Sequence, residues 1–185
     1  QELHIGSNRD SSIDFPVIMF NSLIDVVSYR PGLIPKVIRR KHSPSGMIIP
    51  FDTWRNTDKS RLTVICAGEK DMAIARTYGF NAITITGGER SLPKLWTSQF
   101  KNRDIAIAYD NDETGRKGAK SLAVFLKPHA KSIRVLDLSP VCVEEKEDVW
   151  DYFQKYHKTA EDFKTLIRNT MLFDETAYQE AKEQD

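Results

Sequence analysis

Short apolar runs alternate along residues 61–138 with segments whose apolar positions repeat at helical spacing. Four runs are short enough for buried strands and are rich in β-branched or aromatic residues: 62–66, 82–86, 105–109 and 133–138. Three intervening segments show the helical pattern: 72–78, 92–99 and 116–127. Strands that alternate with helices form right-handed parallel crossovers. The pattern therefore predicts an α/β fold with a doubly wound, mostly parallel four-stranded sheet and flanking helices.

Two further parts flank this region. Residues 15–27 are largely apolar, and we interpret them as a helix that the Pro31-Gly32 pair ends. Residues 47–51 have the character of a short strand that Pro50 stops. From residue 148 onward the pattern is helical, over 150–157, 160–169 and 175–182. We therefore expect a small N-terminal basic lobe, a main domain and a C-terminal helical segment, at residues 1–60, 61–153 and 154–185.

The composition is that of a globular protein, with 40% hydrophobic and 29% charged residues among 185. No apolar run approaches the ~18 residues that a membrane span needs, and the first residues show no signal-peptide pattern. We therefore expect a cytoplasmic protein with no membrane partner. Cys66 and Cys142 form no C-x-x-C motif, which argues against both a zinc ribbon and a disulfide framework.

The net charge of +1 hides an uneven distribution. Residues 144–185 carry 12 acids and 6 bases, whereas residues 30–42 carry five bases and no acid: Arg30, Lys36, Arg39, Arg40 and Lys41. Such a basic segment suits a polyanionic partner such as nucleic acid. A solvated loop explains it equally well.

Two acids directly follow the apolar run at residues 105–109. Asp110 and Asp112 are separated by one residue, so in an extended chain their side chains point the same way. The carboxyl end of a parallel strand faces the crevice where ligands bind. Two carboxylates that converge repel each other unless a cation lies between them, and their oxygens suit Mg²⁺. The alternative is that Asp112 merely caps the following helix.

The order of these motifs resembles the TOPRIM fold, in the form found in phage and plasmid primases of the bacterial type. The resemblance covers roughly residues 61–153 and is strongest over 107–118, I-A-Y-D-N-D-E-T-G-R-K-G. G-E-K-D at 68–71 and the G-G pair after the second strand also match. Residues 147–153 are similar to the K-D-x-N-D-Y-L segment that closes such domains, with Trp150 where Asn is usual. Residues 47–51 resemble the last strand of the small lobe that precedes TOPRIM. The resemblance implies a TOPRIM-like sheet.

The first motif departs from the family pattern. Most of these primases have E-G-x-x-D, in which the acid before the glycine serves the metal, but here Ala67 precedes Gly68. Ala67 can neither bind a cation nor move a proton. Glu69, two positions on, would reach the same pocket if the chain stays extended. Its alternative role is that of an acid at a helix N-terminus.

The resemblance implies metal-dependent nucleotidyl transfer, with Mg²⁺ or Mn²⁺ as the cofactor. Asp110 and Asp112 would bind the metal, Asp148 would be a further ligand, and Glu69 would be the acid or base. Three kinds of contact to substrates are implied. Lys70, Arg116 and Lys117 would contact phosphates, and Gly87 and Gly88 would lie near a nucleotide. The basic segment would contact the template through Arg30, Lys36 and Arg39–Lys41. Solvated lysines and arginines and an ordinary glycine turn are the alternatives.

Three functions remain open at this stage. The first is a DNA primase that makes short RNA primers from nucleoside triphosphates on single-stranded DNA, and that works with a helicase domain or subunit. The second is a nuclease that uses the same acids, and the third is a non-catalytic nucleic-acid-binding module that has lost its first acid. The sequence has neither a Cys/His zinc module nor a G-x-x-x-x-G-K-[ST] motif. We therefore expect a fragment of a longer primase or primase–helicase.

Overall fold

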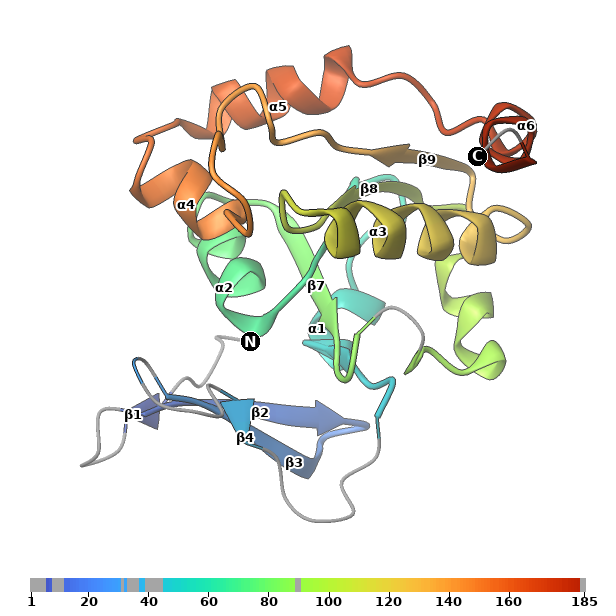
Figure 1. Cartoon of the computed structure of the whole chain (residues 1–185). Helices are drawn as coiled ribbons and strands as arrows, with labels where there is room; N and C mark the ends of the chain where they lie inside the picture. The colour runs from blue at the N-terminus through green and yellow to red at the C-terminus, as the bar shows by residue number, and fades with distance from the viewer. Residues whose placement is uncertain are drawn as a thin grey trace.

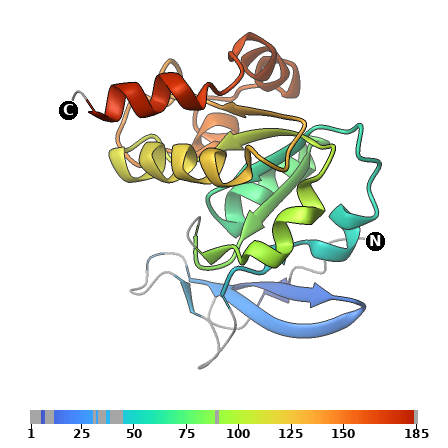
Figure 2. The ribbon, with the colours of Figure 1, turned by 90° about the vertical axis from the view of Figure 1, so that its right-hand side faces the viewer.

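The computed structural model describes residues 6–7, 12–30, 32, 37–38, 45–88 and 91–183. These residues form two sheets, a small antiparallel one near the N-terminus and a larger one with helices on both faces. Figures 1 and 2 show the small sheet lying along one side of the larger α/β unit. The α/β class and the mainly parallel sheet predicted from the sequence are confirmed.

The larger sheet has five strands rather than the expected four, in the order β5-β7-β6-β8-β9. They are β5 (Ile48–Ile49), β6 (Thr63–Cys66), β7 (Asn81–Ile85), β8 (Asp104–Ala108) and β9 (Ser132–Val135). Strands β6 to β9 are parallel, and β5 is an antiparallel edge strand in which Ile48 pairs with Ile85. The strand that we had expected in the small lobe therefore belongs to the larger sheet. The domain boundary at residue 60 remains a prediction.

Alternation along the strands gives each face of this sheet its own apolar layer. Val64 and Cys66 of β6 pack with helices α2 (Glu69–Thr77), α4 (Val149–Gln154) and α5 (Ala160–Asn169). Ile65 faces the other way and packs with α1 (Phe51–Arg55), the 3₁₀ helix η2 (Lys94–Phe100) and α3 (Glu113–Leu126). Such burial on both faces is the reason that β6 to β8 carry apolar residues on both faces rather than on alternate positions only.

The helix expected over residues 15–27 is wrong. Strands β2 (Ile13–Met19) and β3 (Ser22–Tyr29) form an antiparallel hairpin there, flanked by β1 (Gly6–Ser7) and β4 (Val37–Ile38). Phe20 and Asn21 have φ values of 51° and 60°, which is the backbone of a tight hairpin turn. Asp52 of α1 accepts hydrogen bonds from both of their N–H groups, at 2.9 and 2.8 Å. Buried side chains recur at every second position of β2, so the period is that of a strand.

The C-terminal helices agree with the sequence pattern, except that the first, expected over residues 150–157, ends at Gln154. Helix α4 begins at Val149, α5 spans Ala160–Asn169, and α6 spans Glu175–Glu183. Gly79, with φ of 86°, follows the last turn of α2, as expected of a C-cap glycine. Among the described residues, no helix is long and apolar enough to cross a membrane.

Candidate metal centre

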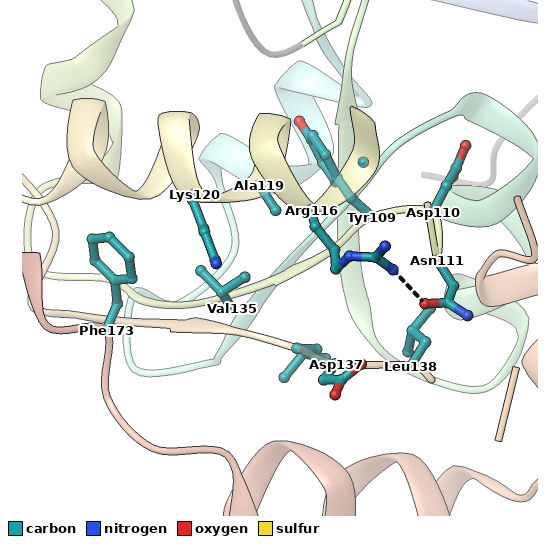
Figure 3. A pocket seen from close by; sticks show the side chains of 12 residues that line it. Tyr109, Asp110, Asn111, Arg116, Ala119, Lys120, Val135, Asp137, Leu138 and Phe173 are labelled. Atoms are coloured by element: carbon teal, nitrogen blue, oxygen red, sulfur yellow. Dashed lines mark hydrogen bonds between the residues drawn. The ribbon is translucent and has the colours of Figure 1, made fainter. Parts of the chain in front are cut away.

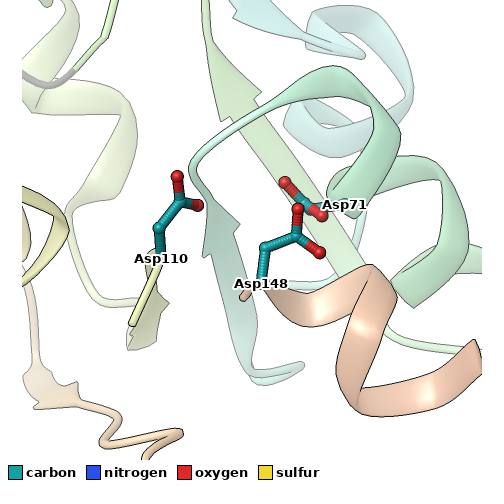
Figure 4. A group of neighbouring side chains, drawn as sticks. All are labelled: Asp71, Asp110 and Asp148. Atoms are coloured by element: carbon teal, nitrogen blue, oxygen red, sulfur yellow. The ribbon is translucent and has the colours of Figure 1, made fainter. Parts of the chain in front are cut away.

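Three carboxylates meet at one edge of the larger sheet. Asp71, Asp110 and Asp148 each offer one oxygen, and these three oxygens all lie within 4.8 Å of one another (Figure 4). Asp71 lies in the first turn of α2, Asp110 follows β8, and Asp148 is the N-cap of α4. Strands β6 and β8 are parallel neighbours, so the segments that leave their carboxyl ends start side by side.

The loop that carries Asp110 is fastened to the loop that leads to Asp148. The Asn111 backbone N–H donates to the Glu147 carbonyl at 2.7 Å, and Asn111 Nδ2 donates to the Cys142 carbonyl at 2.5 Å. The side chain of Asn111 is buried, where unpaired polar groups are costly. These bonds therefore hold two acids that are distant in sequence in one place.

Asp148 divides its two oxygens between a helix and a cation. Its Oδ1 accepts a hydrogen bond from the Asp151 N–H at 3.0 Å, which caps α4, while Oδ2 lies 2.7 Å from Lys70 Nζ. The Lys70 ammonium also lies 5.0 Å from the centroid of the Trp150 ring. Asp71 Oδ1 accepts from the Trp150 backbone N–H at 3.2 Å, so α2 and α4 are joined at the site.

Burial and like charge disfavour three ionised carboxylates here. Burial, with the neighbouring Asp148 charge next in size, raises the pKa of Asp71 well above its ordinary value. Burial and the charges of Asp148 and Asp112 raise the pKa of Asp110 to about 6. A divalent cation bound by the three oxygens would relieve this repulsion, and carboxylates are hard ligands that suit Mg²⁺ and Mn²⁺. The donor set therefore fits such a metal.

A cleft of about 340 Å³ opens over these acids. The small N-terminal sheet contributes Tyr29 to its wall, and the turn after β6 contributes Ala67 and Gly68. Glu69, Lys70, Asp112 and Lys146 also line it. The cleft thus lies between the two sheets.

Two predicted acids lie beside the three-acid group rather than in it. Asp112 Oδ1 accepts a hydrogen bond from the Gly115 N–H at 2.6 Å, so this residue caps α3, the alternative that we had left open. Glu69 is the first residue of α2, so the extended chain that we expected through it ends at Gly68. Both still line the cleft. Asp71, the last residue of the G-E-K-D segment, is a site residue that the sequence pattern does not predict, because the apolar spacing predicts a helix only from residue 72. The available signal is the E-G-x-x-D pattern, whose final acid falls on this position.

The other predicted contact residues are spread over the molecule. Arg116 Nη1 donates to Asn111 Oδ1 at 2.9 Å and lines a different pocket, while Lys117 pairs with the exposed Glu113 at 2.5 Å. Gly87 and Gly88 have positive φ in the turn after β7, outside the residues that line the acid cleft. Arg30 follows β3 directly. Lys36, Arg39, Arg40 and Lys41 lie outside the described residues.

No protein-family model and no curated protein matches the sequence. Among solved structures, the Aquifex aeolicus primase (zinc-binding and RNA polymerase domains) superposes with a TM-score of 0.72 at 18% identity, over 93% of this chain and 43% of that one. The DnaG primase catalytic domain bound to ssDNA gives 0.69 at 16% identity, over 91% and 56%.

A chain from the bacteriophage T7 lagging-strand DNA polymerase in complex with two gp4 primase domains, an RNA/DNA hybrid and dTTP gives 0.65. Its identity is 14%, over 91% of this chain and 83% of that one. The chain spans about half the length of the first two structures. At these identities the likeness concerns the fold, and the chain has the fold of primase domains of the bacterial DnaG and T7 type.

Proposed function

We propose that this chain is the catalytic part of a DNA primase, which synthesises short RNA primers from nucleoside triphosphates on single-stranded DNA. The observation that carries the proposal is the group formed by Asp71, Asp110 and Asp148, at the carboxyl edge of a sheet shared with primase domains. The finer assignment to the TOPRIM form rests on the motif at residues 107–118. Binding of a single-stranded template is consistent with the ssDNA and the RNA/DNA hybrid in two of the similar structures, and work with a helicase is part of the proposal.

Each acid in the group has a role that its surroundings support. Asp71, Asp110 and Asp148 would hold Mg²⁺ or Mn²⁺, which when bound stabilises charge on the attacking and leaving oxygens in nucleotidyl transfer. Asp112 maintains the start of α3, and so the path of the loop that carries Asp110. Lys70, once released from Asp148, can neutralise a phosphate in the cleft. Glu69, on the cleft wall, remains the proposed acid or base.

One observation favours a second candidate, a non-catalytic nucleic-acid-binding module. Ala67 lines the acid cleft where related primases have a carboxylate, so the site has one charge fewer than the family pattern. If an acid is needed there, Ala67→Glu should raise both Mn²⁺ affinity and primer synthesis. If Glu69 does the work instead, Glu69→Gln should abolish synthesis and Ala67→Glu should add little.

Primer synthesis from labelled nucleoside triphosphates on single-stranded DNA, with Mg²⁺ or Mn²⁺, tests the proposal. We expect RNA products that fall by a factor of ~10² or more in Asp110→Asn and Asp148→Asn, since losing a charge-stabilising group costs about that much. Asp104→Asn is the matched control, because Asp104 begins β8 at the opposite end of the strand from Asp110 and pairs with Lys131. Cleavage of the template without synthesis would identify a nuclease, and DNA binding with neither activity would identify the non-catalytic module.

A further inference from the structure

A second pocket lies on the other side of the Asp110–Asn111 loop, between helix α3 and strand β9 (Figure 3). Its volume is about 240 Å³. It opens at the carboxyl ends of β8 and β9, where ligands bind in open α/β sheets. Asp110 lines both this pocket and the acid cleft, but Figure 3 shows its carboxylate directed away from Arg116 and Asn111.

One wall of the pocket carries two cations. Arg116 and Lys120 are four residues apart on α3, so they lie on the same side of the helix. Asn111 Oδ1 accepts from Arg116 Nη1 at 2.9 Å, and the buried Asn111 is itself held by the Cys142 carbonyl. Lys120 Nζ lies 5.7 Å from the centroid of the Tyr178 ring. Within the described part of the chain, neither Arg116 nor Lys120 has a carboxylate in ion-pair distance, so both can neutralise an anion.

The opposite wall is apolar and fixed in place. It is formed by Val135, the last residue of β9, by Leu138 three residues later, and by Phe173 from the segment after α5. The Phe173 backbone N–H donates to the Ile133 carbonyl at 2.8 Å, which holds this segment against the edge of β9. Arg134 Nε donates to the Thr170 carbonyl at 3.1 Å and holds the same segment three residues earlier. A flat apolar group can therefore pack here without a rearrangement.

Besides Asp110, a second acid, Asp137, completes the lining. Asp137 Oδ1 accepts a hydrogen bond from the Ser139 N–H at 2.9 Å, and its Oδ2 has no hydrogen bond within the described residues. Oδ2 can therefore accept a hydrogen bond from a hydroxyl or an amino group. An anion, a flat apolar ring and a hydroxyl or amino donor occur together in a nucleoside phosphate.

We propose that the pocket between α3 and β9 binds a nucleoside phosphate without the help of a metal ion. The phosphate contacts Arg116 and Lys120, the base packs against Phe173 and Val135, and a ribose hydroxyl or base amino group donates to Asp137. The pocket volume of about 240 Å³ is below the ~300–1,000 Å³ that encloses a drug-sized ligand. The pocket therefore cannot enclose the whole nucleotide, and the phosphate remains at its exposed side, next to the two cations. This site is additional to the proposed primer synthesis and does not depend on it.

Calorimetric titration with AMP, GMP and inorganic phosphate in EDTA tests the proposal, because EDTA removes metal-assisted binding at the acid cleft. We expect at least one nucleotide to bind, and to bind about tenfold or more weakly in Arg116→Gln and in Lys120→Gln, since hydrogen bonds to charged groups contribute that much. Lys117→Gln is the matched control on the same helix, because Lys117 pairs with Glu113 outside the pocket. Phe173→Ala should weaken the nucleotide and leave inorganic phosphate unchanged.

Asp148→Asn separates this site from the proposed metal centre. Nucleotide binding in EDTA should persist in that variant, while its primer synthesis is lost. Loss of nucleotide binding in Asp148→Asn would place the ligand at the acid cleft and overturn the proposal. Equal weakening in Lys117→Gln, equal affinity for nucleotide and phosphate, or no binding of either nucleotide would also overturn it. Thermal melting of each variant shows whether a loss of binding comes from a loss of folding.

Discussion

At the scale of single residues, Lys70 is the cation that the acid centre already contains. Its ammonium lies 2.7 Å from Asp148 Oδ2, one oxygen of the three-acid group, and both side chains are partly buried. The ion pair lowers the repulsion among the three carboxylates. A metal that binds Asp148 through this oxygen has to displace Lys70, so the lysine and the metal compete.

We predict that Lys70→Met raises the affinity for Mn²⁺ several-fold and lowers the melting temperature in EDTA. A partly exposed ion pair contributes roughly 1 kcal/mol, which corresponds to a factor of about five in affinity. Calorimetry with Mn²⁺ and melting in EDTA measure the two effects. Lys131→Met is the control, because Lys131 pairs with Asp104 at 2.9 Å, beside the opposite end of β8. A Mn²⁺ affinity in Lys70→Met that equals that of the wild type or falls below it would contradict the competition.

Asp110 should make metal binding depend on pH. Burial, then the charges of Asp148 and Asp112, raise its pKa from 3.8 to about 6, so the folded protein keeps a proton there that the unfolded chain has lost. Stability from this group is therefore greatest at low pH and is lost as the pH rises towards 6. Metal binding needs the ionised form and changes in the opposite sense.

We predict that Mn²⁺ affinity falls as the pH drops below about 6, by up to roughly tenfold per unit for each proton displaced. Titrations at several pH values between about 5 and about 7.5 measure the slope. Asp110→Asn should bind Mn²⁺ weakly at every pH, because its amide oxygen carries no charge. An affinity that is constant across this range in the wild type would show that no proton competes with the metal.

The apolar pattern alone identified only acids that follow a regular strand, whereas Asp148 was expected from the resemblance of residues 147–153 to the closing segment of TOPRIM domains. Asp110 stands at the end of an apolar run, and the alternation of side chains along a strand indicates on which side of the chain its carboxylate lies. Asp71 was missed because polar residues at the start of a helix carry no apolar period, so the pattern placed the beginning of α2 too late. The roles of Asp112 and Asp148 as helix caps depend on where a helix begins, which a pattern gives least well.

At the scale of elements, helix α3 begins very close to the loop that follows β8. A Cβ atom added to Gly115 would lie 2.2 Å from the Asp110 carbonyl oxygen and 3.0 Å from the Asp110 carbonyl carbon. Contacts so short do not occur, and both atoms belong to the backbone. Only glycine therefore lets α3 begin directly against the loop that holds Asp110.

We predict that Gly115→Ala destabilises the protein by about 1–3 kcal/mol, the usual cost of overpacking, and weakens Mn²⁺ binding by displacing Asp110. The sign is informative, because glycine to alanine inside a helix ordinarily stabilises by roughly 0.5–1 kcal/mol. Denaturant unfolding and Mn²⁺ calorimetry measure the two effects. Ser121→Ala, an exposed position on the same helix, should change neither quantity appreciably. A stabilised Gly115→Ala variant with normal Mn²⁺ affinity would contradict the close contact.

The elements of the parallel sheet were predicted well because their runs are apolar on both faces and are separated by regular helices. The N-terminal hairpin was not. Its residues 15–27 are apolar on nearly every position, so the two-residue period is masked and the Phe20-Asn21 turn has no glycine or proline to mark it. Strand β5 is only two residues long, and its place in the larger sheet depends on pairing with β7, which follows only after β6 and α2 in the chain.

At the scale of the whole molecule, the two sheets meet at the acid cleft. Tyr29, the last residue of β3, lines the cleft together with residues that follow β6 and β8. Arg30 comes next in the chain and opens the segment that carries five bases and no acid. The basic segment therefore begins at the edge of the cleft.

We predict that this basic segment binds phosphates when the protein binds single-stranded DNA. Removing one cation that binds a phosphate should shallow the slope of log K against log salt concentration by roughly 0.7, so Arg39→Ala, Arg40→Ala, Lys41→Ala together should change it by about 2. Affinity measured over a range of salt gives the slope. The control replaces Lys59, Lys101 and Lys131 by Ala, three exposed cations that precede β6, β8 and β9 and so lie at the opposite edge of the sheet from the acid cleft. Both variants remove three charges. If DNA binds along the basic segment, only the variant at residues 39–41 should have a shallower slope. Equal changes in both slopes would indicate a general electrostatic effect and contradict the prediction.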